Sequence, residues 1–246
     1  MQDTTEVMRV GAHTAGMFEI GGHLGLQVID GDRVEPLSRI GDTNTAKLLA
    51  IQGKLGGKIH PRGGNSHSWE TRKEETLLIA RSMELHALYR LPYIEAIKAW
   101  STTDDFPILM EITRELQAYN QAPEFPSIEE YIKALRDDMF LAGCFVNRGR
   151  RLLNGRTQIN SFNKPLLKAI QITLEVPGLL GYFESVYEPG DISNFADGPY
   201  VLHKGAYRIM LGVHQTYALL ERIQDADYVY ADFISRILDK SYIPLK

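Results

Sequence analysis

Every second residue is apolar in a short stretch near the start of the chain. Leu24, Leu26 and Val28 hold these positions, a turn sequence Asp-Gly-Asp follows at residues 30–32, and the alternation resumes after it. A period of two residues is typical of a β-strand with one buried face, and a turn between two such runs indicates a hairpin. We therefore predict β structure over residues 1–41.

From about residue 72 onward, apolar residues recur every three or four positions, which is typical of amphipathic helices. In the helix that begins near Pro107, for example, Ile108, Ile112 and Leu116 share one face. A shorter helix is expected near residues 43–51. The helices predicted from this spacing cover about 72–89, 93–100, 107–119, 127–139, 164–175, 178–187, 205–223 and 229–238, and residues 188–204 are predicted as a loop.

Two segments match the capping box Thr/Ser-x-x-Glu, in which a hydroxyl and a carboxylate satisfy N–H groups at a helix start. Thr71 and Glu74 form the first match, and Ser127 and Glu130 form the second. The first match predicts that the glycine-rich segment before it leads directly into a helix N-terminus.

No strand–helix–strand alternation is found, which argues against a doubly wound parallel sheet as the fold class. The prediction is an α+β fold that is mostly α. In it, an N-terminal β-hairpin region (1–60) packs on a mostly helical body (61–246) within one compact domain. No internal repeat is apparent along the chain.

The composition is that of an ordinary globular protein, with 44% hydrophobic and 24% charged residues in a chain of 246. The formal net charge of −4 gives no overall argument for nucleic acid, so only local clusters of cations can indicate such a partner. The single cysteine, Cys144, excludes an internal disulfide and favours a reducing compartment. Because no run of about 18 apolar residues occurs, we expect a cytoplasmic protein without a membrane partner.

The segment from Gly53 to Glu75 is the densest cluster of residues with binding or catalytic chemistry. Its glycines allow tight turns and the close approach of a ligand to the backbone. No acidic residue occurs between Asp42 and Glu70, and a helix N-terminus attracts anions. The candidate phosphate-binding residues of this segment are Lys58, Arg62, Asn65 and Ser66.

His60 is the candidate general acid or base of the same segment, because histidine titrates near neutral pH. Glu74 or Glu75 would orient His60 or the nucleophile. The segment is also consistent with a solvated basic loop whose glycines only serve turns, and the sequence leaves both interpretations open.

A second basic segment lies between Asp138 and Glu175, where no acidic residue occurs. Amide and aromatic residues are interleaved with its cations, a combination that suits a phosphate backbone and exposed bases. An acidic stretch without Lys or Arg follows over residues 169–203. The candidate nucleic-acid-binding residues are Arg148, Arg150, Arg151, Arg156 and Lys164.

Three interpretations fit this second segment: binding of a nucleotide or nucleic acid, binding of an acidic protein partner, or pairing of the basic and acidic stretches as neighbouring solvated surfaces. We further hypothesise that the two acid-free segments face each other across one cleft.

The first functional hypothesis is an enzyme of the transferase or hydrolase type that acts on a nucleotide or nucleic acid, with the glycine-rich, His60-containing loop as its site. The alternative is a non-enzymatic helical module that binds nucleic acid or protein through the basic segment 148–168. The sequence leaves the cofactor unknown, including whether a metal ion joins the phosphate.

Overall fold

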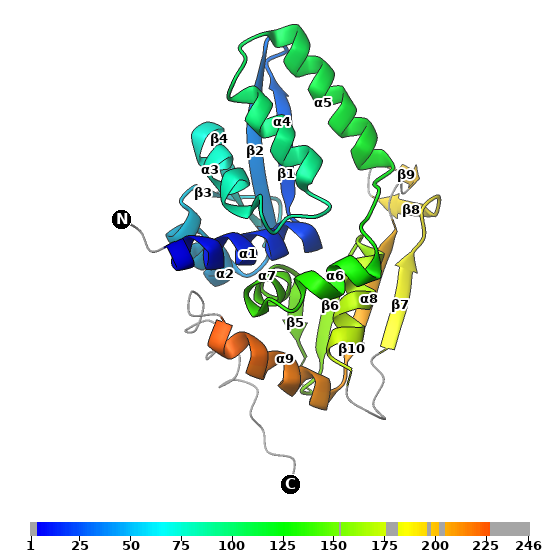
Figure 1. The fold of residues 1–246 in the computed structure, drawn as a ribbon. Coiled ribbons are helices and arrows are strands. Elements are labelled where there is room, and N and C mark those ends of the chain that lie inside the picture. Colours follow the sequence, from blue (N-terminus) through cyan, green and yellow to red (C-terminus); the bar gives the residue numbers. More distant parts are fainter. Residues whose placement is uncertain (1–3, 153, 176–181, 196–197, 202–204, 227–246) are drawn as a thin grey trace.

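The computed structural model describes residues 4–152, 154–175, 182–195, 198–201 and 205–226. Within these ranges the chain combines helices with antiparallel sheets, so the α+β class is confirmed (Figure 1). Strands take a larger share than "mostly α" implies, because two sheets of four strands each are present. None of the helices in the described ranges is both long and apolar enough to cross a membrane.

The first half of the molecule is a helix followed by a four-stranded antiparallel sheet in the order β1-β2-β4-β3. The predicted hairpin is confirmed as β1 and β2, with Val28 opposite Val34. The elements of this half are α1 (Thr4–Ile20), β1 (His23–Ile29), β2 (Arg33–Asp42), α2 (Thr45–Leu55), β3 (Lys58–Pro61), β4 (His67–Arg72) and α3 (Lys73–Met83).

The second half repeats this plan, because its sheet has the order β5-β6-β10-β7, again first, second, fourth, third. A two-stranded hairpin, β8 with β9, is inserted before the last strand of the sheet. The elements are α7 (Asp138–Arg148), β5 (Gly149–Arg151), β6 (Thr157–Ser161), α8 (Lys164–Thr173), β7 (Tyr182–Tyr187), β8 (Ile192–Phe195), β9 (Gly198–Val201), β10 (Ala206–Leu211) and α9 (Val213–Ala226). The helices α4 (Leu91–Trp100), α5 (Phe106–Gln121) and α6 (Ile128–Ala134) connect the halves.

The two halves are an internal duplication that the sequence alone did not reveal. In α1, Ala15, Gly16 and Phe18 recur at one constant offset in α7 as Ala142, Gly143 and Phe145. Contacts recur with the residues: a Cβ on Gly22 would meet the ring of Phe18, and a Cβ on Gly149 would meet the ring of Phe145. The expectation of no internal repeat is therefore wrong. The repeat is not apparent in the sequence because only a few packing positions keep the same residue in both halves.

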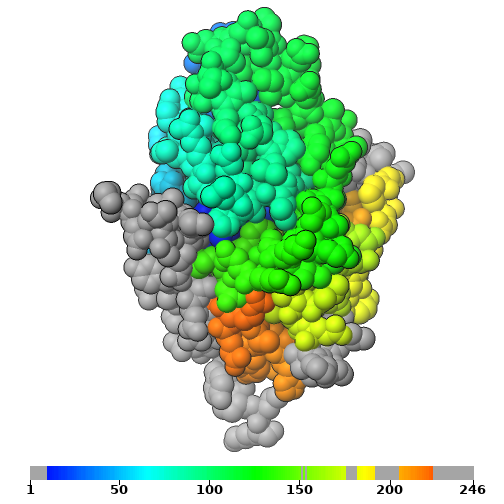
Figure 2. Space-filling view, in the orientation of Figure 1, coloured from blue at the N-terminus to red at the C-terminus, as the bar shows by residue number. Residues whose placement is uncertain are grey.

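Each sheet has one buried and one polar face, because side chains alternate along a strand. In the first sheet, Leu24, Ile40 and Trp69 are buried on the face covered by helices, and the Trp69 indole donates to Gly56 at the end of α2. In the second sheet, Ile159 and Ile209 are buried as a directly opposed pair. Figure 2 shows the helical side of the molecule, with the cyan-to-green α3 to α6 above the orange α9.

The largest correction concerns residues 4–20, which form α1 rather than β structure. Two glycines of this helix, Gly11 and Gly16, lie where α1 touches neighbouring backbone. The helix therefore needs these glycines for close packing, a tertiary reason that outweighs their low helix propensity.

The capping box predicted at Thr71 is also wrong. The first residue before α3 is Arg72, which makes no side-chain cap hydrogen bond, and Lys73 has a left-handed φ of 51°. Thr71 belongs to β4 and its hydroxyl is hydrogen-bonded to Ser38 and Thr76. The second box is confirmed, since Ser127 and Glu130 make both expected hydrogen bonds.

Several helix limits differ as well. The predicted helix 72–89 ends at Met83, the helix 127–139 divides into α6 and α7, and 107–119 and 164–175 agree with α5 and α8. Residues 182–187 and 206–211 are strands that pair with each other, and in the second of them buried positions alternate with half-buried ones. The predicted loop 188–204 contains β8 and β9, and the helix predicted at 229–238 lies outside the described residues.

Candidate nucleic-acid interface

The polar face of the first sheet carries the cations of the glycine-rich segment. Strand register places Lys58 and Arg39 opposite Glu70, and His60 opposite Ser68. Directly opposed residues of antiparallel strands point to the same face. These five side chains therefore share the face that lies opposite the Leu24, Ile40 and Trp69 layer.

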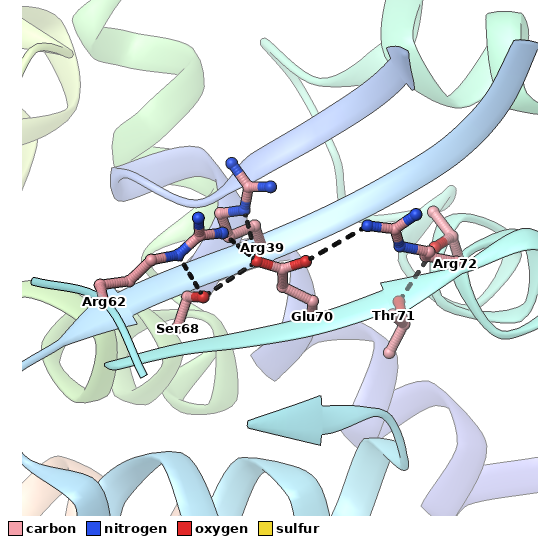
Figure 3. Close-up of polar contacts among 7 residues, drawn as sticks. Arg39, Arg62, Ser68, Glu70, Thr71 and Arg72 are labelled. Atoms are coloured by element: carbon pink, nitrogen blue, oxygen red, sulfur yellow. Dashed lines mark hydrogen bonds and ion pairs between the residues drawn. The ribbon is translucent and has the colours of Figure 1, made fainter. Parts of the chain in front are cut away.

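Glu70 is the centre of a hydrogen-bonded cluster on this face (Figure 3). Its Oε1 accepts hydrogen bonds from Arg39 Nε and from Ser68 Oγ, each at 2.9 Å. Arg62 Nη2 also donates to Oε1, and Arg62 Nε donates to Ser68. Arg72 Nη2 lies 3.9 Å from Oε2. One carboxylate thus holds three guanidinium groups along the same strip of sheet.

The cluster is anionic at its buried centre and cationic at its surface. Glu70 is only 5% exposed, whereas Arg39, Arg62 and Arg72 are 37%, 46% and 50% exposed. Burial would raise the pKa of Glu70, but the hydrogen bonds from Ser68, Arg39 and Arg62 outweigh it and hold that pKa below its ordinary value. Three cations facing one anion leave positive charge at the surface.

A pocket of about 420 Å³ opens beside this cluster. It lies between the end of β2 and the turn that joins β3 to β4. Two of the candidate phosphate-binding residues, Arg62 and Ser66, contribute to it. Its lining residues are Arg39, Gly41, Asp42, Thr43, Arg62, Ser66, His67 and Ser68.

The remaining candidates of the glycine-rich segment occupy two different places. Lys58, His60 and Asn65 are exposed, the first two on β3 and the third in the β3–β4 turn. Glu74 and Glu75 lie in the first turn of α3, whose Thr76 reaches Thr71 on the helix-covered face.

Glu74 lines a separate pocket with Trp100, and Glu75 Oε1 lies 3.5 Å from the position of a Cβ on Gly56. The structure therefore groups His60 with the phosphate candidates and not with these two glutamates.

The second sheet presents a matching polar face. Arg208 of β10 lies opposite Asn160 and Glu184, and Arg150 lies opposite Gln158. Arg208 donates to Asn160 and to Glu184 at 3.2 Å each, and Gln158 donates to Asn160 at 3.1 Å. Arg208 is not among the residues predicted for the site, because residues 205–223 are predicted to be helical. The alternation of buried Tyr207, Ile209 and Leu211 was the available signal.

The candidates of the second basic segment separate in the same way. Arg150 lies on the polar face, Arg148 ends α7, and Arg156 is exposed in the turn before β6. Arg151 belongs to β5, where it pairs with Thr157. Lys164 lies on the helical side, since its ammonium is 4.9 Å from the centre of the Tyr207 ring and 3.7 Å from Glu188. That ion pair joins the basic segment to the acidic one.

Solved structures with a similar fold include I-SmaMI bound to an uncleaved DNA target in the presence of calcium ions. It is 14% identical, with a TM-score of 0.55 over 95% of this chain and 93% of that one. The LAGLIDADG meganuclease I-AabMI bound to uncleaved DNA is 12% identical, with a TM-score of 0.51 over 95% and 93%. The chain has the fold of I-SmaMI and I-AabMI. No family model and no curated protein matches its sequence.

I-SmaMI was solved in the presence of calcium ions. Divalent hard cations take several oxygen ligands, mostly carboxylates. Among the described residues, no group of three or more His, Cys, Asp and Glu side chains is placed to hold a metal ion. Where the two halves meet, Asp42 is already paired with the ammonium group of Lys47. The residues of this junction do not fit a divalent cation.

Proposed function

We propose that the protein binds double-stranded nucleic acid, DNA first, along the polar faces of its two sheets. The observation that carries this proposal is the pair of equivalent antiparallel sheets, each with arginines on the face that the helices leave open. Exposed arginines bind backbone phosphates, and amides such as Gln158 and Asn160 suit base edges. I-SmaMI and I-AabMI, which share the fold, were solved on DNA.

The electrostatics support the same proposal despite the net charge of −4. A duplex attracts clustered cations because their binding releases condensed counterions, and the affinity gained in this way falls as the salt concentration rises. Glu70 holds Arg39 and Arg62 in fixed positions, so little side-chain freedom is lost when a phosphate approaches.

The test uses a labelled duplex of roughly 30 base pairs, about three helical turns, titrated by fluorescence anisotropy at several salt concentrations. The double variant Lys58→Gln and Arg150→Gln removes one exposed cation from each sheet. We expect binding to weaken at least tenfold and the salt slope to fall by about two.

The matched control is Arg81→Gln with Arg114→Gln, which removes two exposed cations from α3 and α5. It should bind within about twofold of the unchanged protein, because these helices lie away from the polar faces. Equal losses in both double variants, or no binding of duplex by the unchanged protein, would refute the proposal.

A second candidate function is hydrolysis of a phosphodiester at the same face, with His60 as general acid or base. The observation in its favour is that His60 is exposed and lies opposite Ser68, beside the Arg62 cluster. His60→Ala should abolish cleavage of a duplex without changing the melting temperature. Cleavage that persists in this variant would remove His60 from the reaction.

A further inference from the structure

The two halves meet where α1 packs against α7 (Figure 1), and the ends of these helices are joined by a hydrogen bond from Arg148 to Gly21. The C-terminus of a helix carries a partial negative charge because its last carbonyl groups have no partner within the helix. Two such ends close together would repel the phosphates of a duplex. Cationic side chains occupy this place instead.

Arg148 and Lys47 each bind a carbonyl oxygen at one of these helix ends. Arg148 Nη2 donates to Gly21 O at the end of α1, at 2.7 Å. Lys47 Nζ donates to Asn147 O at the end of α7, at 2.7 Å, and also pairs with Asp42. Lys47 is buried, whereas Arg148 is exposed. Buried Arg90 also binds the end of α1, where its Nε donates to Phe18 O at 2.9 Å. Three cations and the carboxylate of Asp42 therefore occupy the junction, and the exposed cation among the three is Arg148.

The position that Arg148 holds at the end of α7 is held by a glycine at the end of α1. Gly21 and Arg148 are equivalent positions, each one residue before the glycine that ends the shared segment. A Cβ on Gly21 would overlap Nε of Arg148, so the small residue in one half makes room for the guanidinium of the other. The pair is complementary in shape as well as in hydrogen bonding.

The junction is continuous with both polar faces. Asp42, the partner of Lys47, lines the same pocket as Arg39 and Arg62 on the first sheet. Arg148 is followed along the chain by Arg150, on the polar face of the second sheet. A duplex that crosses from one sheet to the other would pass Arg148.

We infer that Arg148, positioned by Gly21, binds a backbone phosphate at the junction directly, without a bridging divalent cation. This inference rests on the proposed function, because it assumes a duplex lying across both sheets. A guanidinium has N–H groups beyond the one used for Gly21 O, and their planar arrangement suits two phosphate oxygens.

Two variants separate a positioned contact from a general effect of charge. Arg148→Gln removes the cation, while Gly21→Ala keeps the charge and displaces the guanidinium, a flexible group that can move without disturbing the fold. We expect both variants to weaken duplex binding at least fivefold while melting within a few degrees of the unchanged protein. Unchanged affinity in Gly21→Ala would overturn the positioned contact.

The role of a divalent metal ion is tested by measuring the duplex affinity of the unchanged protein with EDTA and with excess calcium, at equal ionic strength. The dissociation constant should agree within twofold, because the junction does not use a metal bridge. Binding that is tenfold tighter with calcium would overturn the inference.

The outcomes also separate this inference from the proposed function. If the duplex does not bind at all, the proposed function fails. If it binds in a way that depends on Lys58 and Arg150 but not on Arg148, only the inference about the junction fails.

Discussion

Gly16 of α1 and Gly143 of α7 each lie against the backbone of the other helix. A Cβ on Gly16 would overlap the carbonyl oxygen of Phe140, and a Cβ on Gly143 would overlap that of His13. The relationship is reciprocal because Phe140 and His13 are themselves equivalent positions in the duplication. Such direct contact between two helix backbones fixes how the two halves, and therefore the two sheets, are placed relative to each other.

The first prediction follows from this contact. Gly143→Ala should lower the free energy of unfolding by about 3 kcal/mol, because the overlapping atom is backbone and cannot move aside. Urea denaturation measures the loss. The control is Gly53→Ala within α2, where a Cβ meets nothing within 4 Å and the helix should gain roughly 0.5–1 kcal/mol. Equal effects of the two substitutions would contradict the close packing.

The second prediction concerns Glu70. Glu70→Gln should destabilise the fold by about 2 kcal/mol at pH 7, because the amide replaces a buried anion that accepts three hydrogen bonds. The folded pKa lies below the ordinary value of 4.5, so this stabilisation is present above pH 4.5 and is lost as the pH falls through the folded value.

Thermal or urea unfolding from pH 7 to pH 3 measures this difference. The gap between the unchanged protein and Glu70→Gln should narrow below pH 4.5. Glu111→Gln, an exposed carboxylate on α5, is the control and should behave like the unchanged protein throughout. A gap that stays constant with pH would show that Glu70 acts through packing alone.

The third prediction concerns Glu19, which is fully buried at the end of α1. Its Oε1 accepts from the backbone N–H groups of Leu88 and Arg90, and its Oε2 accepts from Tyr89 N and Tyr131 Oη. In Glu19→Gln an NH₂ group would face two of these donors, so we expect a loss of about 3 kcal/mol. Tyr131→Phe removes one donor and should cost about 1.5 kcal/mol. A smaller loss in Glu19→Gln than in Tyr131→Phe would contradict this network.

The fourth prediction separates the contributions of the two sheets. Lys58→Gln and Arg150→Gln lie on different sheets, so their effects on duplex affinity should add to within about 0.5 kcal/mol. Each single variant should lower the salt slope by about one. Anisotropy titrations of the two single variants and of the double variant measure these affinities and salt slopes. If one single variant alone showed the whole loss of affinity, the duplex would lie on one sheet only.

The sequence was sufficient wherever local chemistry decides the structure. The β1–β2 hairpin follows from alternation around a turn, α5 follows from its apolar spacing after Pro107, and α6 follows from the Ser127 capping box. The cations of both acid-free segments were also evident, and two of the candidate phosphate ligands, Arg62 and Ser66, do share a pocket.

The tertiary structure alone decided the rest. Nothing local distinguishes a glycine that breaks a strand from Gly16, which lets a helix approach another, so α1 was predicted as β structure. The same holds for the site. Glu70 lies beyond the acid-free segment, and only strand pairing brings it to Arg39 and Arg62. Arg148 and Gly21 are distant in sequence, and only the packing of two equivalent helices places one against the other.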